Sequence, residues 1–189
     1  MKKHINWYLD GWRRRTEYDV SGKKHTVWDY QGAYYSYHLE AAALSRLKWR
    51  RIATGVFLLL LWIVLSLSPA KGKDYAFYVG GPWFLAILPL MELLLGMIGT
   101  GRTRAQMTYR DFYAGYKRLQ YGSYILFPLL FVAVVSDIVF AIVYRQYIST
   151  LWEILWIIGA AICMLTDGVL IVSLCRNVPQ MMPPVEGNR

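Results

Sequence analysis

The sequence predicts an all-α integral membrane protein, a bundle of four transmembrane helices with a small β-structure near the N-terminus. Three observations predict this class. Hydrophobic residues make up 56% of the 189 residues, which is high for a soluble domain of this size. Four apolar stretches are long enough to cross the hydrocarbon core of a bilayer. The basic residues are concentrated on one side of these stretches, as in membrane proteins that follow the positive-inside rule.

The four apolar stretches are the expected membrane spans. They cover residues 52–68, 76–98, 123–144 and 151–174. A single apolar segment in lipid has to satisfy every backbone N–H and C=O internally, and a helix does so. We therefore expect residues 1–51 to form an N-terminal head, residues 52–175 to form the transmembrane domain, and residues 176–189 to form a short tail.

The basic residues of the loops set the expected orientation. The head, the loop between spans two and three, and the tail carry 18 of the 21 Lys and Arg residues, whereas the other two loops carry only Lys71, Lys73 and Arg145. The positive-inside rule then places both termini in the cytoplasm. The first apolar run starts about fifty residues into the chain, too late for a cleavable signal peptide. We expect the first span to remain as an anchor in the plasma (inner) membrane.

The head is rich in aromatic residues and has the pattern of a small antiparallel sheet. Residues 16–20 and 25–30 are typical of two strands around a glycine-containing turn. Residues 34–39 fit a third strand, so we predict a β-meander that begins with a hairpin. Three short strands are marginal on their own, and we expect the membrane surface or the bundle to cover them. Residues 40–51 have a helical pattern and are expected to continue into the first span.

The loop between spans two and three contains the pattern of an amphipathic helix. Thr108 and Asp111 have the spacing of a capping box. Apolar residues recur after them at helical spacing, beside Lys117 and Arg118. The sequence therefore predicts a basic amphipathic helix at the membrane interface.

The basic and aromatic residues of the cytoplasmic side are candidates for binding lipid or a partner. Trp and Tyr favour the headgroup level and Lys and Arg pair with anionic lipid, so membrane anchorage is the simpler explanation. A dedicated regulatory or partner site is the alternative. Nucleic acid is not expected as a partner, because no recognised RNA or DNA motif accompanies these residues. The candidates are Arg13, Arg14, Arg15, Trp28, Arg50, Arg51, Arg110, Lys117 and Arg118.

Carboxylates inside the spans are the best pointers to an ion site. A charged Asp at the centre of a transmembrane helix costs about 2.5 to 3.5 kcal/mol on insertion scales. No Lys, Arg or His lies within a span to pair with them. Small residues neighbour each acid at helical spacing, which predicts that the acids face the bundle interior. The candidates for binding a proton or a hard cation are Glu92, Asp167 and Asp137, whereas Glu153 lies nearest the outer edge, where solvation alone accounts for it.

Glu92 and Asp167 are expected at one depth, on the cytoplasmic side of mid-span. Pro89 lacks an N–H and frees the carbonyl of Leu85 on the same helix face as Glu92. Two carboxylates and a free carbonyl suit a proton or a hard cation. The alternative is that the acids are neutral and hydrogen-bonded to hydroxyl or backbone groups, which holds the helices in register.

No enzyme, metal or cofactor motif accompanies these features. The three histidines lie in the head at spacings that fit no metal site. Cys163 and Cys175 are separated by about 18 Å of helix, too far for a disulfide. We expect no cofactor and no catalytic residues.

These observations favour a small non-enzymatic membrane protein that acts as an accessory, regulatory or assembly subunit through its basic cytoplasmic surface. The alternative is a proton- or cation-coupled transporter or channel component, and a membrane-embedded enzyme ranks third. The expected partners are membrane lipids, including anionic headgroups, and a second copy or another membrane protein. A partner is expected because four helices enclose little more than a narrow cavity.

Overall fold

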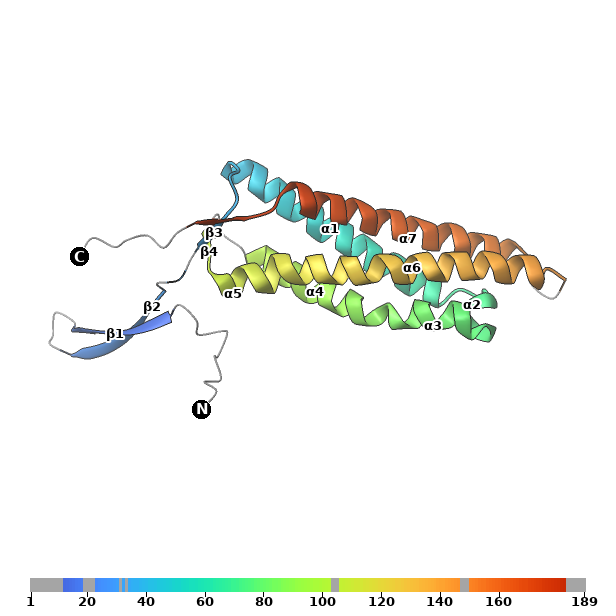
Figure 1. Cartoon of the computed structure of the whole chain (residues 1–189), viewed down its shortest axis with the longest axis horizontal. Helices are drawn as coiled ribbons and strands as arrows, with labels where there is room; N and C mark the ends of the chain where they lie inside the picture. The colour runs from blue at the N-terminus through green and yellow to red at the C-terminus, as the bar shows by residue number, and fades with distance from the viewer. Residues whose placement is uncertain are drawn as a thin grey trace.

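In the computed structural model the helices form a four-helix bundle with short strands at one end (Figure 1). The structure describes residues 12–18, 23–30, 32, 34–102, 106–146 and 150–182. Within these residues, four helical segments are long and apolar enough to span a membrane, as the sequence predicts. The main helices are α1 (Ala41–Ser66), α3 (Phe77–Leu85), α4 (Ile87–Arg102), α6 (Arg118–Val143) and α7 (Thr150–Arg176).

The four segments form a closed ring and alternate in direction. Helix α1 contacts α4 and α7, and α6 contacts α3, α4 and α7. We call the end of the bundle where α1 begins and α7 ends the basic end. We call the opposite end, where α1 and α6 end, the loop end. The basic end and the loop end lie at opposite ends of the long axis in Figure 1.

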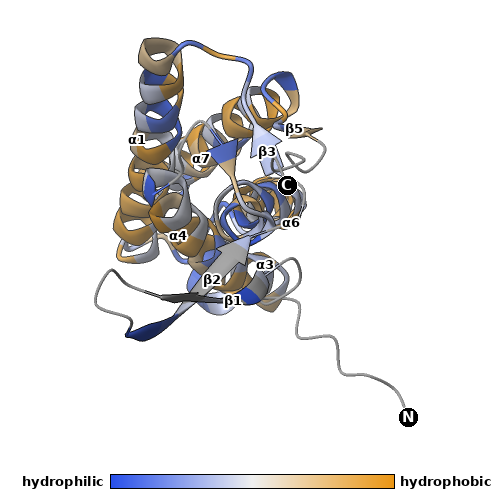
Figure 2. Ribbon diagram, turned by 90° about the vertical axis from the view of Figure 1, so that its left-hand side faces the viewer, coloured by the Kyte–Doolittle hydropathy of each residue, from blue (hydrophilic) through white to orange (hydrophobic). Residues whose placement is uncertain are grey.

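The outside of the bundle is apolar as well as its core. Large side chains such as Phe57, Leu88, Phe131 and Ile142 are exposed on the four segments. The helices are mostly hydrophobic in Figure 2, whereas the strand β2 (Lys24–Tyr30) contains a strongly hydrophilic stretch. A monomer in water rarely exposes such a large apolar surface, so this surface suits contact with lipid.

Helices α3 and α4 are one span interrupted at Ala86. Pro89 has no N–H to donate to the carbonyl of Leu85, which breaks the helical ladder at this point. The chain remains helical on both sides, because the N–H of Ala86 bonds to the carbonyl of Pro82 and the N–H of Leu90 bonds to the carbonyl of Ala86, both at 3.1 Å.

The hairpin predicted in the head is present, but the predicted third strand pairs elsewhere. Strand β1 (Trp12–Tyr18) pairs antiparallel with β2. Strand β3 (Tyr34–Ser36) instead lies between β4 (Gln106–Met107) and β5 (Gln180–Met182). The meander prediction is therefore wrong at β3. In its observed place β3 is hydrogen-bonded on both edges, and Tyr37, Leu44 and Met107 form a small apolar cluster beside it.

The predicted amphipathic helix is present as the first turns of the third long apolar segment. Helix α5 (Tyr109–Phe112) is capped by Thr108, whose Oγ1 accepts the N–H of Asp111 at 3.3 Å. A π-helical turn, η1 (Tyr113–Lys117), connects α5 to α6 without a break. Gly99 of α4 lies against the backbone of this turn at Ala114, so closely that a side chain on Gly99 would collide with it.

Arg51 of α1 closes the basic end of the bundle from the inside. Its side chain is buried, with the residue 2% exposed. The guanidinium donates to the carbonyls of Ser173 (3.0 Å) and Asn177 (3.3 Å) and to the hydroxyl of Tyr37 (3.0 Å). The carbonyl end of a helix carries a partial negative charge, so Arg51 caps α7 with a favourable charge. Burial raises the pKa of Tyr37 above its usual 10.0, although Arg51 opposes the increase.

Replacing Arg51 with Met should destabilise the bundle. The substitution keeps an apolar stem but leaves the Ser173 and Asn177 carbonyls without their charged donor. Hydrogen bonds to charged groups contribute about 1.5 to 3 kcal/mol. We expect the free energy of unfolding in detergent to fall by about that amount.

The control is Arg50→Met, because Arg50 is exposed and adjacent in sequence. Its effect should stay within about 0.5 kcal/mol. Equal melting temperatures for the two variants would contradict the role assigned to Arg51.

Candidate functional site

Asp137 and Asp167 lie in the core of the bundle without hydrogen bonds. Both residues are fully buried. Among the described residues, none hydrogen-bonds to the four carboxyl oxygens of this pair. A buried carboxylate without a partner is costly, so such a group takes up a proton, a cation or water.

Asp167 is surrounded by two other small polar groups, and we call the three the Asp167 site. The Ser123 hydroxyl on α6 lies beside the Asp167 carboxyl group. It is fully buried and has no hydrogen-bond partner among the described residues. Cys163 lies one turn before Asp167 on α7, and it is also fully buried. The neighbouring core residues are apolar, including Leu126 and Leu170.

Asp137 and Glu153 meet at Gly72, near the loop end. Glu153 is buried, and its Oε1 accepts the N–H of Lys71 at 2.6 Å. The N–H of Gly72 lies 3.3 Å from Oε2 and 3.4 Å from Oε1 of the same carboxylate. Asp137 lies so close to Gly72 that a side chain at this position would collide with the Asp137 carboxyl group. Glu153 is thus a buried acceptor and not the solvated residue expected from its position near the outer edge.

The two unpartnered acids belong to separate sites. Asp167 lies beside Ser123 of α6, and Asp137 of α6 lies beside Glu153 of α7. Along either helix the two acids are therefore 14 residues, or roughly 21 Å, apart. Buried apolar residues fill the core at intermediate levels, including Leu130, Ala133 and Ala160. These residues do not form a polar relay between the two acids.

Glu92 lies near the depth of Asp167 but faces another direction. Gly122, the neighbour of Ser123, packs against Leu93 of α4, which places Glu92 close to the level of the Asp167 site. The Glu92 side chain is 50% exposed and forms an ion pair with Arg118, with Oε2 and Nε 3.7 Å apart. No hydrogen bond or ion pair joins Glu92 to Asp167 among the described residues. The structure does not bring them together into one oxygen-lined site.

The basic and aromatic candidates differ in their surroundings. Arg14, Arg50 and Arg110 are exposed, and Arg14 donates to the Thr26 hydroxyl at 3.4 Å. Arg51 is buried, in contrast to the expectation of a lipid contact. The ammonium of Lys117 lies over the rings of Phe112 and Tyr121 and donates to Gln120 at 3.1 Å. The side-chain positions of Arg13, Arg15 and Trp28 lie outside the described part of the structure.

Contacts of aromatic residues connect the head to the loop between the second and third spans. The ring of Tyr35 stacks on Phe112 with centroids 4.0 Å apart and an interplanar angle of 4°. The N–H of Tyr109 donates to the Tyr30 hydroxyl at 3.2 Å. We call β3, β4, β5 and α5 together the basic-end layer. The sequence signal for these contacts was the high aromatic content of both segments, but it did not identify the pairs.

Comparisons with known proteins add no family or activity to this geometry, because no protein-family model, curated protein or solved structure matches the chain. Within the described residues, no group of three or more His, Cys, Asp and Glu side chains could hold a metal ion. The candidate features are therefore the Asp167 site, the Asp137–Glu153 pair around Gly72, and the basic-end layer.

Glu153 and Asp137 should respond differently to replacement by the matching amide. Glu153→Gln replaces one of the two carboxylate oxygens that accept the N–H groups of Lys71 and Gly72 with an NH₂ group. We expect the free energy of unfolding to fall by about 1 to 3 kcal/mol. Asp137→Asn removes no hydrogen bond and should change stability by about 0.5 kcal/mol or less. Chemical denaturation in detergent measures both values, and the opposite ranking would show that the two roles are wrongly assigned.

Proposed function

We propose that the protein is an integral protein of the plasma (inner) membrane with cytoplasmic termini, and that it acts as a non-enzymatic accessory, regulatory or assembly subunit. The observation that carries this proposal is the sheet β4–β3–β5. It joins the head, the loop between spans two and three, and the tail into one layer at the basic end. Three segments that are distant in sequence thus contribute to one surface.

The distribution of charge and apolar surface supports membrane insertion in this orientation. The four segments have the length and hydropathy of membrane spans. The segments that meet at the basic end carry 18 of the 21 Lys and Arg residues of the chain. Basic residues of this kind stay in the cytoplasm during insertion, and they favour anionic lipid afterwards.

The hairpin β1–β2 supports the proposal that the protein binds a partner. It lies beyond the basic end of the bundle in Figure 1. Within the described residues, β1 and β2 pair only with each other, so each strand has an outer edge without a neighbouring strand. An isolated two-stranded hairpin is marginally stable in water, and free strand edges bind a further strand readily. A partner that adds a strand to this hairpin would stabilise both.

Disrupting the hairpin should remove the partner and leave the bundle intact. Thr26 is exposed on β2, opposite Thr16 of β1. Thr26→Pro removes a backbone N–H and disfavours the strand, whereas Thr26→Val keeps strand propensity. We expect proteins that co-purify with the full-length chain in mild detergent to remain with Thr26→Val and to fall at least tenfold with Thr26→Pro.

Quantitative mass spectrometry of the purified material measures this ratio, and a thermal melt of each variant checks the bundle. The same set of co-purifying proteins at the same level in both variants would contradict the proposal.

A second candidate function is binding of a proton or cation by Asp137 and Asp167. It is favoured by one observation, the complete burial of two carboxyl groups that no described residue hydrogen-bonds. The roughly 21 Å of apolar core between them favours two separate binding events over conduction along a chain of acids.

Thermal melts of the purified chain across pH 5 to 8, with Na⁺, K⁺ or Ca²⁺, test this candidate. A ligand that binds only the folded state stabilises it by about 2.7 kcal/mol at a concentration one hundred times its dissociation constant. We expect such a shift in the wild type and its loss in Asp137→Asn or Asp167→Asn. Glu92→Gln is the control, because Glu92 is half-exposed and paired with Arg118. A wild type that responds to neither pH nor cations would remove this candidate.

A further inference from the structure

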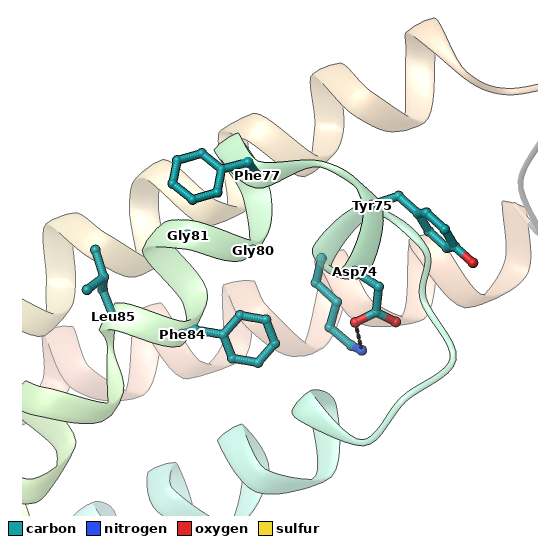
Figure 3. Close-up of a pocket in the computed structure, with 8 residues that line it drawn as sticks. Asp74, Tyr75, Phe77, Gly80, Gly81, Phe84 and Leu85 are labelled. Atoms are coloured by element: carbon teal, nitrogen blue, oxygen red, sulfur yellow. Dashed lines mark hydrogen bonds and ion pairs between the residues drawn. The ribbon is translucent and has the colours of Figure 1, made fainter.

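A groove at the loop end combines an ion pair, between a buried lysine and a half-exposed aspartate, with exposed aromatic walls (Figure 3). It lies between α3 and the short helix α2 (Gly72–Tyr75) and has a volume of about 570 Å³. This region contains neither the Asp167 site nor the basic-end layer. The groove is lined by Lys73, Asp74, Tyr75, Phe77, Gly80, Gly81, Phe84 and Leu85.

The polar end of the groove has both hydrogen-bond donors and hydrogen-bond acceptors that are available to a ligand. The Lys73 side chain is 4% exposed, and its Nζ lies 2.9 Å from Oδ1 of Asp74. An ammonium has three N–H donors, and this is the single hydrogen bond that Lys73 makes among the described residues. The Asp74 side chain is 48% exposed, so its carboxylate remains open to a further donor.

Two glycines of α3 shape the groove in different ways. Gly80 lies directly against the backbone carbonyl of Lys73, and a side chain there would collide with it. This contact holds α2 against α3 and positions the ion pair at the polar end of the groove. Gly81 has more room, because a side chain would meet only the ring of Phe77 at an ordinary 3.7 Å. Its missing side chain keeps the groove open.

The apolar walls face the outside of the bundle. Phe77 is 90% exposed, and Phe84 and Leu85 are about half-exposed. In Figure 3 Phe77 and Phe84 project from different sides of α3, with the Phe84 ring turned toward Asp74, and Leu85 lies farther along the helix. The groove therefore runs from its polar end onto the apolar surface. A phospholipid has the same order of groups, with a polar headgroup followed by apolar acyl chains.

We propose that this groove binds one phospholipid whose headgroup carries both a phosphate and a primary ammonium, as phosphatidylethanolamine does. The phosphate accepts the free N–H groups of Lys73, and the ammonium donates to Asp74. One acyl chain lies along Phe77, Phe84 and Leu85. The inference rests on the membrane insertion proposed above and is independent of any protein partner.

The ion pair selects this headgroup over the common alternatives. An anionic headgroup without an ammonium satisfies Lys73 but is repelled by the Asp74 carboxylate. A choline headgroup has the right charges, but its trimethylammonium has no N–H to donate to Asp74. Free phosphate lacks the chain that covers the apolar walls. Phosphatidylethanolamine matches all three parts of the groove.

Native mass spectrometry of the purified full-length chain tests the proposal. The chain is depleted of lipid in mild detergent and then mixed with phosphatidylethanolamine, phosphatidylcholine or phosphatidylglycerol of identical acyl chains. We expect one phosphatidylethanolamine per chain, retained at least fivefold more than either of the other lipids. Equal retention of the three headgroups would overturn the proposal.

Two variants act on different parts of the groove. Lys73→Gln removes the ammonium, and Gly81→Leu fills the groove while leaving the ion pair in place. Both should lose the fivefold preference. Lys71→Gln is the matched control, because Lys71 is exposed on the same connection and does not line the groove. Retention of the preference in Gly81→Leu would overturn the proposal, as would its loss in Lys71→Gln.

A folding control and a membrane control separate the possible failures. The buried ring of Trp83 packs against the rings of both Trp62 and Trp156, so near-ultraviolet circular dichroism reports whether a variant is folded. If Lys73→Gln does not fold, Gly81→Leu decides the result. Fractionation of cell membranes before purification tests insertion itself, so a chain absent from the membrane fraction would contradict the proposed function and not the headgroup preference.

Discussion

A positive charge sealed inside the basic end is the constraint on which the rest of the structure depends. A buried guanidinium is tolerated only when its donors are satisfied, and Arg51 satisfies them with the carbonyl end of α7 and the Tyr37 hydroxyl. Tyr37 directly follows β3, so the same interaction positions the strand that joins the head to the loop and the tail. The Tyr116 hydroxyl donates to the carbonyl of Leu174 at 3.1 Å and extends the cap to the third long apolar segment. The bundle and the basic-end layer are therefore held by one set of hydrogen bonds.

The parts of the fold that the sequence predicted depend on neighbouring residues. Span length, the cap at Thr108 and the hairpin β1–β2 are determined by residues within one turn or one pair of strands. The parts that it missed depend on distant residues. Glu153 accepts a backbone N–H from a residue 82 positions away, and Arg51 bonds to Ser173, 122 positions away. No pattern within a single helix identifies such distant partners. The predicted pairing of β3 with the hairpin was wrong for the same reason.

The acids show how well helical spacing predicts whether a side chain faces the interior of the bundle. Small neighbours correctly indicated that Asp137 and Asp167 face the interior. The same argument applied to Glu92 gave the wrong direction, because its side chain is half-exposed. Gly96 is indeed buried, against Leu119 of α6. Residues four apart on a helix differ by about 40° around its axis, and this rotation is enough to place Glu92 at the edge of the contact, where Arg118 reaches it.

Helix α7 is attached by polar groups at both of its ends, and this has a consequence for the order of events during synthesis. At the loop end it supplies Glu153 to the N–H groups of Lys71 and Gly72, and at the basic end it supplies carbonyls to Arg51. Until α7 has left the ribosome, the earlier helices hold a guanidinium and two backbone donors that lack their final acceptors. Helix α7 therefore supplies the acceptors that complete the packing of these four helices, and its docking is expected to be the closing step of their assembly.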